Sequence, residues 1–134
     1  MQIPYLFVYG TLRSDSPKKS PVKKALNLIA ERWCKASVKG KLYEIDWYPG
    51  LVLSDNPHDA VTGEIFRITD DESLFTRLDE YEGCFEGFPE PHEYRREKVS
   101  VVTEDGETVA AWAYLYNWDV YEESRIHSGD YLNP

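Results

Sequence analysis

Cysteine and histidine are scarce in this sequence. The 134 residues contain 2 cysteines and 3 histidines. The cysteines, Cys34 and Cys84, have neither metal-ligand spacing nor a thiol redox motif. The histidines are scattered among turn-forming residues: His58, His92 and His127. We therefore expect no metal site and no cofactor, and a cytoplasmic protein with reduced thiols.

Long apolar runs and positive charge are also lacking. No run approaches the length of a membrane span, and no charged segment precedes the short apolar run near the start, so we expect neither a membrane span nor a signal peptide. The formal net charge of −9 disfavours nucleic acid and anionic membranes as partners. One local basic cluster, Arg13 with Lys18, Lys19, Lys23 and Lys24, is interpreted as a solvated loop and helix face. The alternative is a local attraction for an anionic ligand.

Several catalytic signatures are missing as well. The sequence has no glycine-rich phosphate loop, no dinucleotide fingerprint and no Gly-x-Ser-x-Gly elbow. The chemistry that remains is that of a carboxyl group acting with backbone amides.

What is present is a pattern of short strands, in a chain that is 14% aromatic. Apolar runs and alternation predict these strands: Tyr5–Tyr9, Ala36–Leu42, Leu51–Ser54, Ala60–Ile68, Tyr94–Thr103 and Thr108–Tyr116. Asp105-Gly106 predicts a tight hairpin turn between the last two, and Gly63 predicts a bulge or a close backbone approach. Asn117–Pro134 is expected to be irregular. A first helix is predicted from Ser20, the N-cap, to about Trp33.

A second predicted helix, Thr69–Gly83, carries the most informative residue. Leu74, Phe75, Leu78 and Tyr81 form an apolar stripe, and at about 100° per residue Glu82 falls inside it. Burial and the negative end of the helix dipole both raise the pKa of such a carboxyl, toward that of a general acid–base. The alternative interpretation is a fraying last turn with Glu82 in water.

The segment Tyr9-Gly10-Thr11-Leu12 is the second candidate. A glycine directly after a buried strand lets successive N–H groups turn toward one point and form an anion-binding nest. The alternative is an ordinary turn after a strand. Together the elements predict one α+β domain, residues 1–134, built as a small mixed or antiparallel β-barrel of about six strands with flanking helices.

These short segments follow one another along the chain: Phe7-Val8-Tyr9-Gly10-Thr11-Leu12-Arg13, Gly40-x-Leu42-Tyr43, Tyr48-Pro49-Gly50, Val61-x-Gly63-Glu64, Leu78-Asp79-x-x-Glu82-Gly83, Tyr94-x-Arg96, Val99-x-Val101 and Ser128-Gly129-Asp130-Tyr131. In this order they resemble the gamma-glutamylcyclotransferase-like family, in particular its short bacterial and amine-cleaving branch.

The resemblance implies a fold, an activity and a site. It implies a small β-barrel with flanking helices, Glu82 as catalytic acid–base, and Tyr9, Gly10, Thr11 and Leu12 as the binding loop for a small γ-glutamyl substrate. The implied reaction closes a γ-glutamyl amide to 5-oxoproline and releases an amine. Two alternatives stay open: removal of a γ-glutamyl cap from a larger metabolite, and a non-catalytic ligand-binding domain of the same fold. The sequence ranks neither the leaving amines nor the oligomeric states, and it assigns no role to residues 84–93 or to the C-terminal tail.

Overall fold

The computed structural model describes residues 5–10, 12–14, 16, 23, 24, 26, 30–45, 48–68, 78 and 92–134. Its elements follow in this order: β1 (Tyr5–Val8), β2 (Ala30–Glu44), β3 (Pro49–Leu53), β4 (Ala60–Ile68), β5 (Tyr94–Thr103), β6 (Thr108–Tyr116), the 3₁₀ helix η1 (Glu122–Ser124) and β7 (Arg125–Ile126). No helix in the described part of the chain is long and apolar enough to cross a membrane.

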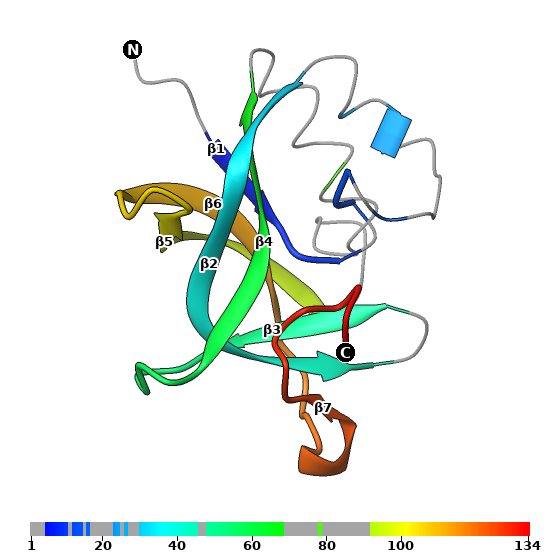
Figure 1. Cartoon of the computed structure of the whole chain (residues 1–134). Coiled ribbons are helices and arrows are strands. Elements are labelled where there is room, and N and C mark those ends of the chain that lie inside the picture. Colours follow the sequence, from blue (N-terminus) through cyan, green and yellow to red (C-terminus); the bar gives the residue numbers. More distant parts are fainter. Residues whose placement is uncertain are drawn as a thin grey trace.

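The strands β2, β4, β1, β6 and β5 are neighbours in that order, and β5 returns to β2 to close a barrel (Figure 1). Ala36 and Ser37 of β2 pair with Thr103 and Val102 of β5 at this closure. The β1–β6 pair is parallel and the other pairs are antiparallel, so the barrel is mixed. The predicted small barrel is confirmed. The predicted flanking helices fall mostly outside the described residues.

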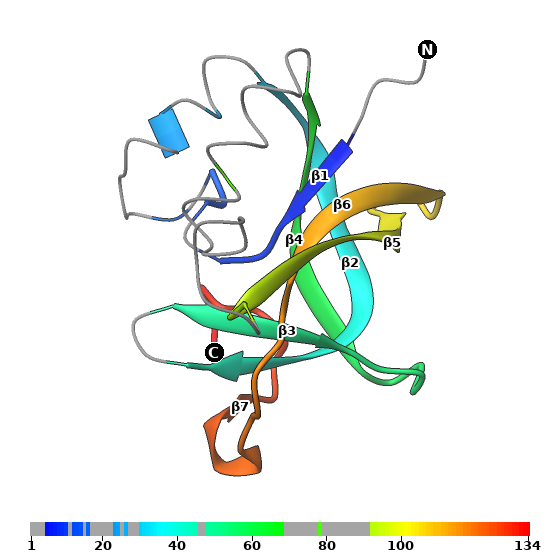
Figure 2. The ribbon, with the colours of Figure 1, turned by 180° about the vertical axis from the view of Figure 1, so that it is seen from behind.

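The long strand β2 holds the molecule together. It pairs with β4 and β5 inside the barrel and continues past it to pair with β3 and β7 (Figure 1). From Cys34 to Leu42 every second side chain is buried, and those between are exposed or half-buried. This alternation is the pattern from which the strand Ala36–Leu42 is predicted. Seen from behind, β3 and β7 are both at one end of the barrel, with the end of β2 between them (Figure 2).

Strand β1 is buried on both faces, which explains its unbroken apolar sequence. Phe7 points into the barrel core with Leu42, Ile65 and Leu115. Leu6 and Val8 belong to a second cluster on the other face. The second cluster also contains Leu12, Leu26, Leu78, Tyr94, Tyr114 and Tyr116.

The prediction of a helix from Ser20 to about Trp33 is wrong at its C-terminal end. Lys23, Lys24 and Leu26 are helical, but Ala30–Trp33 begins strand β2. The β2–β4 register shifts between Arg32 and Cys34, a bulge that leaves Trp33 as an extra residue. The bulge breaks the strand's two-residue alternation, so this stretch resembles the last turn of a helix.

The predictions for the β-hairpin and for Gly63 are confirmed. Strands β5 and β6 have the predicted bounds, and Gly106 has a φ of 91° in the turn between them. At Gly63, a Cβ atom would lie 2.2 Å from the carbonyl oxygen of Val8. Only glycine lets β4 approach the end of β1 so closely. Residues 117–134 are irregular apart from η1 and β7, as predicted.

Candidate active site

Tyr9 directly follows strand β1, and its hydroxyl group holds it in place through two hydrogen bonds. The hydroxyl donates to the carbonyl oxygen of Tyr114 at 2.6 Å and accepts from the amide of Leu51 at 3.3 Å. The residue is only 7% exposed, so these bonds replace water for all three groups. Tyr9 therefore ties the start of the candidate loop to β6 and β3, and its buried ring serves as an anchor.

Gly10 is required by the close approach of Pro49. A Cβ atom at position 10 would lie 2.6 Å from Pro49 Cγ, closer than real side chains come. The amide of Arg13 donates to the carbonyl oxygen of Gly10 at 3.1 Å, which closes a turn. Leu12 is 6% exposed and packs into the second cluster, so its side chain anchors the turn in the protein. Thr11, the remaining predicted loop residue, lies outside the described residues.

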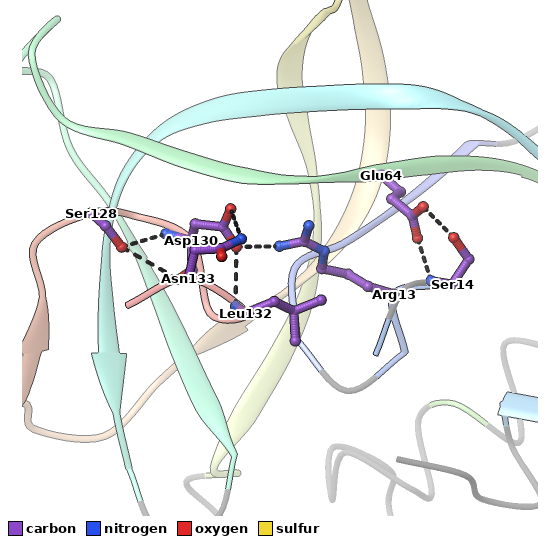
Figure 3. Close-up of polar contacts among 7 residues, drawn as sticks. All are labelled: Arg13, Ser14, Glu64, Ser128, Asp130, Leu132 and Asn133. Atoms are coloured by element: carbon purple, nitrogen blue, oxygen red, sulfur yellow. Dashed lines mark hydrogen bonds and ion pairs between the residues drawn. The ribbon is translucent and has the colours of Figure 1, made fainter. Parts of the chain in front are cut away.

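Arg13 contradicts the interpretation of the basic cluster as solvated. Its side chain is 2% exposed, and Nη1 donates to Asp130 Oδ1 at 2.7 Å (Figure 3). Lys23 is also buried, and its Nζ donates to the carbonyl oxygen of Ser16 at 2.7 Å. Lys24 is exposed as expected, whereas Lys18 and Lys19 lie outside the described residues.

Further hydrogen bonds orient the carboxylate of Asp130 toward Arg13. Its Oδ1 also accepts from the amide of Leu132 at 3.0 Å, and its Oδ2 accepts from Asn133 Nδ2 at 3.3 Å (Figure 3). Burial by itself would raise the pKa of Asp130, but these hydrogen bonds and the charge of Arg13 outweigh it and hold that pKa below its usual range. Asp130 is therefore an ionised partner for Arg13.

Glu64 on β4 binds Ser14, the residue that follows Arg13. Its Oε1 accepts from the amide of Ser14 at 2.5 Å, and its Oε2 accepts from Ser14 Oγ at 2.5 Å. Arg32 Nε donates to Oε2 at 2.6 Å. The Glu64 side chain is 2% exposed, so a buried carboxylate receives three donors and a positive charge. Figure 3 shows the two donors of Ser14.

A cluster of tyrosines adjoins Pro49, the residue that approaches Gly10. The Tyr94 hydroxyl donates to the carbonyl oxygen of Pro49 at 2.6 Å. The Tyr94 ring lies 5.3 Å from that of Tyr116 and 6.1 Å from that of Tyr48. The Tyr48 hydroxyl donates to Glu93. Burial raises the pKa of Tyr116, as do nearby Glu93, Tyr121 and Asp119, so its hydroxyl stays neutral.

The predicted catalytic residue, Glu82, lies outside the described residues. Leu78, four positions earlier on the predicted apolar stripe, is helical and fully buried. It belongs to the same cluster as Leu12. The prediction that Glu82 shares a pocket with the Tyr9–Leu12 loop therefore stays a prediction.

Sequence reasoning missed the partners of Arg13 and Ser14. Asp130 and Glu64 both stand in segments that carry the family resemblance, but nothing in their spacing pairs them with the loop. The one available signal was an arginine directly after Tyr-Gly-Thr-Leu in an acidic chain. No group of three or more potential metal ligands occurs within the described ranges. His58 and His127 are exposed and His92 is half-buried.

Together these features define a small closed-barrel protein with a tightly anchored turn directly after its first strand. The sequence model of the family described as "Gamma-glutamyl cyclotransferase, AIG2-like" matches residues 6–133. The chain therefore belongs to this family, and membership supports γ-glutamyl cyclotransferase activity in general.

Two curated relatives agree with this assignment. The gamma-L-glutamyl-butirosin B gamma-glutamyl cyclotransferase of Niallia circulans is 36% identical over 125 residues, which cover 92% of this chain and 74% of the relative. A protein of Methanocaldococcus jannaschii, provisionally named a gamma-glutamylcyclotransferase, is 32% identical over 130 residues, which cover 95% of this chain and 94% of the relative.

Solved structures share the fold. A Bacillus subtilis protein is 27% identical with a TM-score of 0.69 over 97% of this chain, which spans 40% of that longer protein. A mouse AIG2-like protein is 24% identical with a TM-score of 0.67, and the match covers 100% of this chain and 97% of the mouse protein. The mouse likeness supports the closed-barrel fold alone.

Proposed function

We propose that this protein is a cyclotransferase that converts a γ-glutamyl amide to 5-oxoproline and a free amine. The observation that carries the proposal is the family match over residues 6–133, a range that includes both the Tyr9–Leu12 loop and Glu82. The anchoring of Tyr9 and the turn at Gly10 support it, because a loop that binds substrate through backbone amides must be held still.

The substrate carries its own nucleophile. Its α-amine nitrogen attacks the γ-carbonyl carbon and forms the five-membered ring, and the bond from that carbon to the leaving nitrogen breaks. Two protons leave the α-ammonium and end on the departing amine. Folding the substrate so that amine and carbonyl meet supplies most of what the reaction needs, without a metal or cofactor.

Glu82 has the role of proton carrier in this proposal. It accepts a proton from the α-ammonium group and delivers it to the leaving nitrogen, a contribution of about 10²–10⁴ in rate. The loop amides of Tyr9–Leu12 bind the substrate carboxylate or the carbonyl oxygen as charge develops on it. Local donors of this kind are needed because the net charge of −9 repels anions from the molecule as a whole.

The test is release of 5-oxoproline from a panel of γ-glutamyl amines, γ-glutamyl dipeptides and glutathione. Glu82→Gln should lower turnover by about 10²–10⁴ while leaving folding and ligand binding in place. Glu80→Gln is the matched control, because the helical pattern places Glu80 on the opposite side and turnover should not change. Near-parental activity of Glu82→Gln would show that another group carries the proton.

A second candidate function is removal of a γ-glutamyl cap from a larger metabolite by the same ring closure. The name of the Niallia circulans relative, which is 36% identical, specifies such a substrate, γ-L-glutamyl-butirosin B. Adding γ-L-glutamyl-butirosin B to the panel tests it. Turnover of this compound at least tenfold above that of simple γ-glutamyl amines favours cap removal. Ligand binding without turnover at any pH favours a binding module.

A further inference from the structure

Two carboxylates, one fully buried and one partly buried, hold the residues that follow Leu12. Arg13 has one of the largest fully buried side chains in the described part of the chain. Its guanidinium group donates to Asp130 at 2.7 Å. Ser14 gives both its amide and its hydroxyl to Glu64 at 2.5 Å. Figure 3 shows the two carboxylates reaching the loop from different segments. Asp130 lies on the C-terminal turn, 117 residues from Arg13, and Glu64 lies on β4.

Both anchors are fixed to the same strand. The carbonyl oxygen of Gly129 accepts from the amide of Thr62 on β4 at 2.8 Å. Gly129 has a φ of 71°, and a Cβ atom there would lie 1.9 Å from the carbonyl oxygen of Ala60. The turn that presents Asp130 is thus pressed against β4, the strand that also presents Glu64. The loop after β1 is therefore attached to the barrel wall at two consecutive residues, Arg13 and Ser14.

An ion pair with one buried and one partly buried partner contributes little to stability. The cost of removing two charges from water roughly cancels their attraction, and apolar residues of similar size often stabilise a fold as well or better. What the pair supplies instead is direction, since charge-assisted hydrogen bonds fix one arrangement of the groups they join. The amide of Arg13 closes the turn on Gly10, so the direction of its side chain and the path of the loop are coupled.

We propose that Arg13 and Asp130 are positioning residues for the reaction, and that their ion pair sets the geometry of the Tyr9–Leu12 loop through the C-terminal segment. This proposal rests on the proposed function, because the loop is the substrate-binding element there. Neither side chain contacts substrate in this account. Their effect reaches the substrate through the backbone between Gly10 and Arg13.

The test separates positioning from stability by replacing the whole pair. The double variant Arg13→Met/Asp130→Leu keeps apolar volume without charge, and its melting temperature should stay within about 4 °C of the parent. KM for the best γ-glutamyl substrate should rise roughly ten- to a hundredfold, with a much smaller change in kcat, because binding by the displaced loop is lost in ground state and transition state alike. The single variant Arg13→Lys keeps both the positive charge and Asp130. Its affinity for the substrate should therefore be much closer to that of the parent than to that of the double variant.

A second ion pair in the same chain supplies the matched control. Arg125 Nη2 donates to Asp59 Oδ1 at 2.8 Å, and their side chains are 18% and 11% exposed. Neither residue contacts the loop in the described structure. The pair lies beside the turn that presents Asp130, because Arg125 is on the same C-terminal segment and Asp59 precedes Ala60, which contacts Gly129. Arg125→Met/Asp59→Leu should therefore raise KM far less than Arg13→Met/Asp130→Leu, since it disturbs this segment without removing a hydrogen bond to the loop.

Hydrogen exchange gives a readout that does not depend on turnover. Peptides covering Tyr9–Ser16 should exchange faster in Arg13→Met/Asp130→Leu than in the parent, whereas peptides from β5 and β6 should be unchanged. If exchange and KM both match the parent, or if the control pair raises KM equally, the proposal is overturned. If the parent turns over no γ-glutamyl compound, the proposed function fails, and the exchange result alone decides whether the pair positions the loop.

Discussion

At the scale of single residues, the loop is held mainly by polar atoms that have left water. The Tyr9 hydroxyl donates to one strand and accepts from another, and both partners are backbone groups. A typical hydrogen bond inside a protein contributes about 0.5–1.5 kcal/mol net, because folding exchanges it for hydrogen bonds to water. Such a residue fixes position strongly even when its net effect on stability is modest.

Removing the Tyr9 hydroxyl therefore has a defined cost. Tyr9→Phe removes both of these hydrogen bonds, and we expect the free energy of unfolding to fall by about 1–3 kcal/mol. KM for the γ-glutamyl substrate should also rise. Urea unfolding measures the first effect and initial rates the second. Tyr5→Phe, which keeps its ring stacked on Trp33 at 5.2 Å, is the control and should change neither by much.

The ion pair of Asp130 makes one contribution to stability dependent on pH. Because its pKa is lowered in the folded state, Asp130 binds its proton more readily when unfolded, so its contribution is complete above its ordinary pKa of about 3.9. It is lost as pH falls through the lower, folded pKa. The free-energy difference between the parent and Asp130→Asn should therefore be constant from pH 7 to about pH 5 and shrink below about pH 4. A difference that grows toward acid would contradict this assignment.

At the scale of elements, the approach of β4 to β1 decides where the loop begins. The carbonyl oxygen of Val8 and the ring of Phe7 crowd Gly63, and Phe7 in turn is part of the barrel core. Strand β1 is only 4 residues long, so its position depends on this contact and on the four register pairs with β4. The geometry of the candidate loop is thus set partly by a glycine on a different strand.

Gly63→Ala should consequently disturb both fold and function. A Cβ atom 2.2 Å from a backbone oxygen cannot be accommodated by a side-chain rotation, so the strands must separate. We expect a loss of about 1–3 kcal/mol in the free energy of unfolding, the usual cost of overpacking, together with a raised KM. Gly106→Asn, in a turn with open space around it, tests backbone strain alone and should lower stability by about 1 kcal/mol without affecting KM.

Elements with an undisturbed pattern could be predicted from the sequence. The β5–β6 hairpin and β4 have the expected bounds because alternation and turn residues agree locally. The start of β2 could not be predicted, since the bulge at Trp33 interrupts the alternation that identifies a strand. In the site, Tyr9 and Gly10 follow from a local motif. The Arg13–Asp130 contact does not, because tertiary packing across 117 residues has no periodic signature.

At the scale of the whole molecule, closure of the barrel brings these distant segments together. The β2–β5 junction is short, with two register pairs, yet it places β5 and β6 around β1 and so delivers the Tyr114 carbonyl to Tyr9. The C-terminal segment then crosses to the loop and adds Asp130. The candidate site therefore depends on both ends of the chain.

The net charge of the molecule predicts which leaving groups it favours. A chain with 24 acidic and 15 basic side chains carries a formal charge of −9, which raises the local concentration of cations and lowers that of anions. Raising ionic strength from about 0.01 M to about 1 M shortens the Debye length from ~30 Å to ~3 Å and removes this effect. For a γ-glutamyl amide whose leaving group carries an additional positive charge in the substrate, kcat/KM should fall at least about threefold over that range. For γ-glutamyl methylamide, whose leaving group carries no charge in the substrate, kcat/KM should stay nearly constant. Equal salt responses for the two substrates would mean that the molecular field plays no part in selecting them, and that leaving-group preference resides only in contacts at the site.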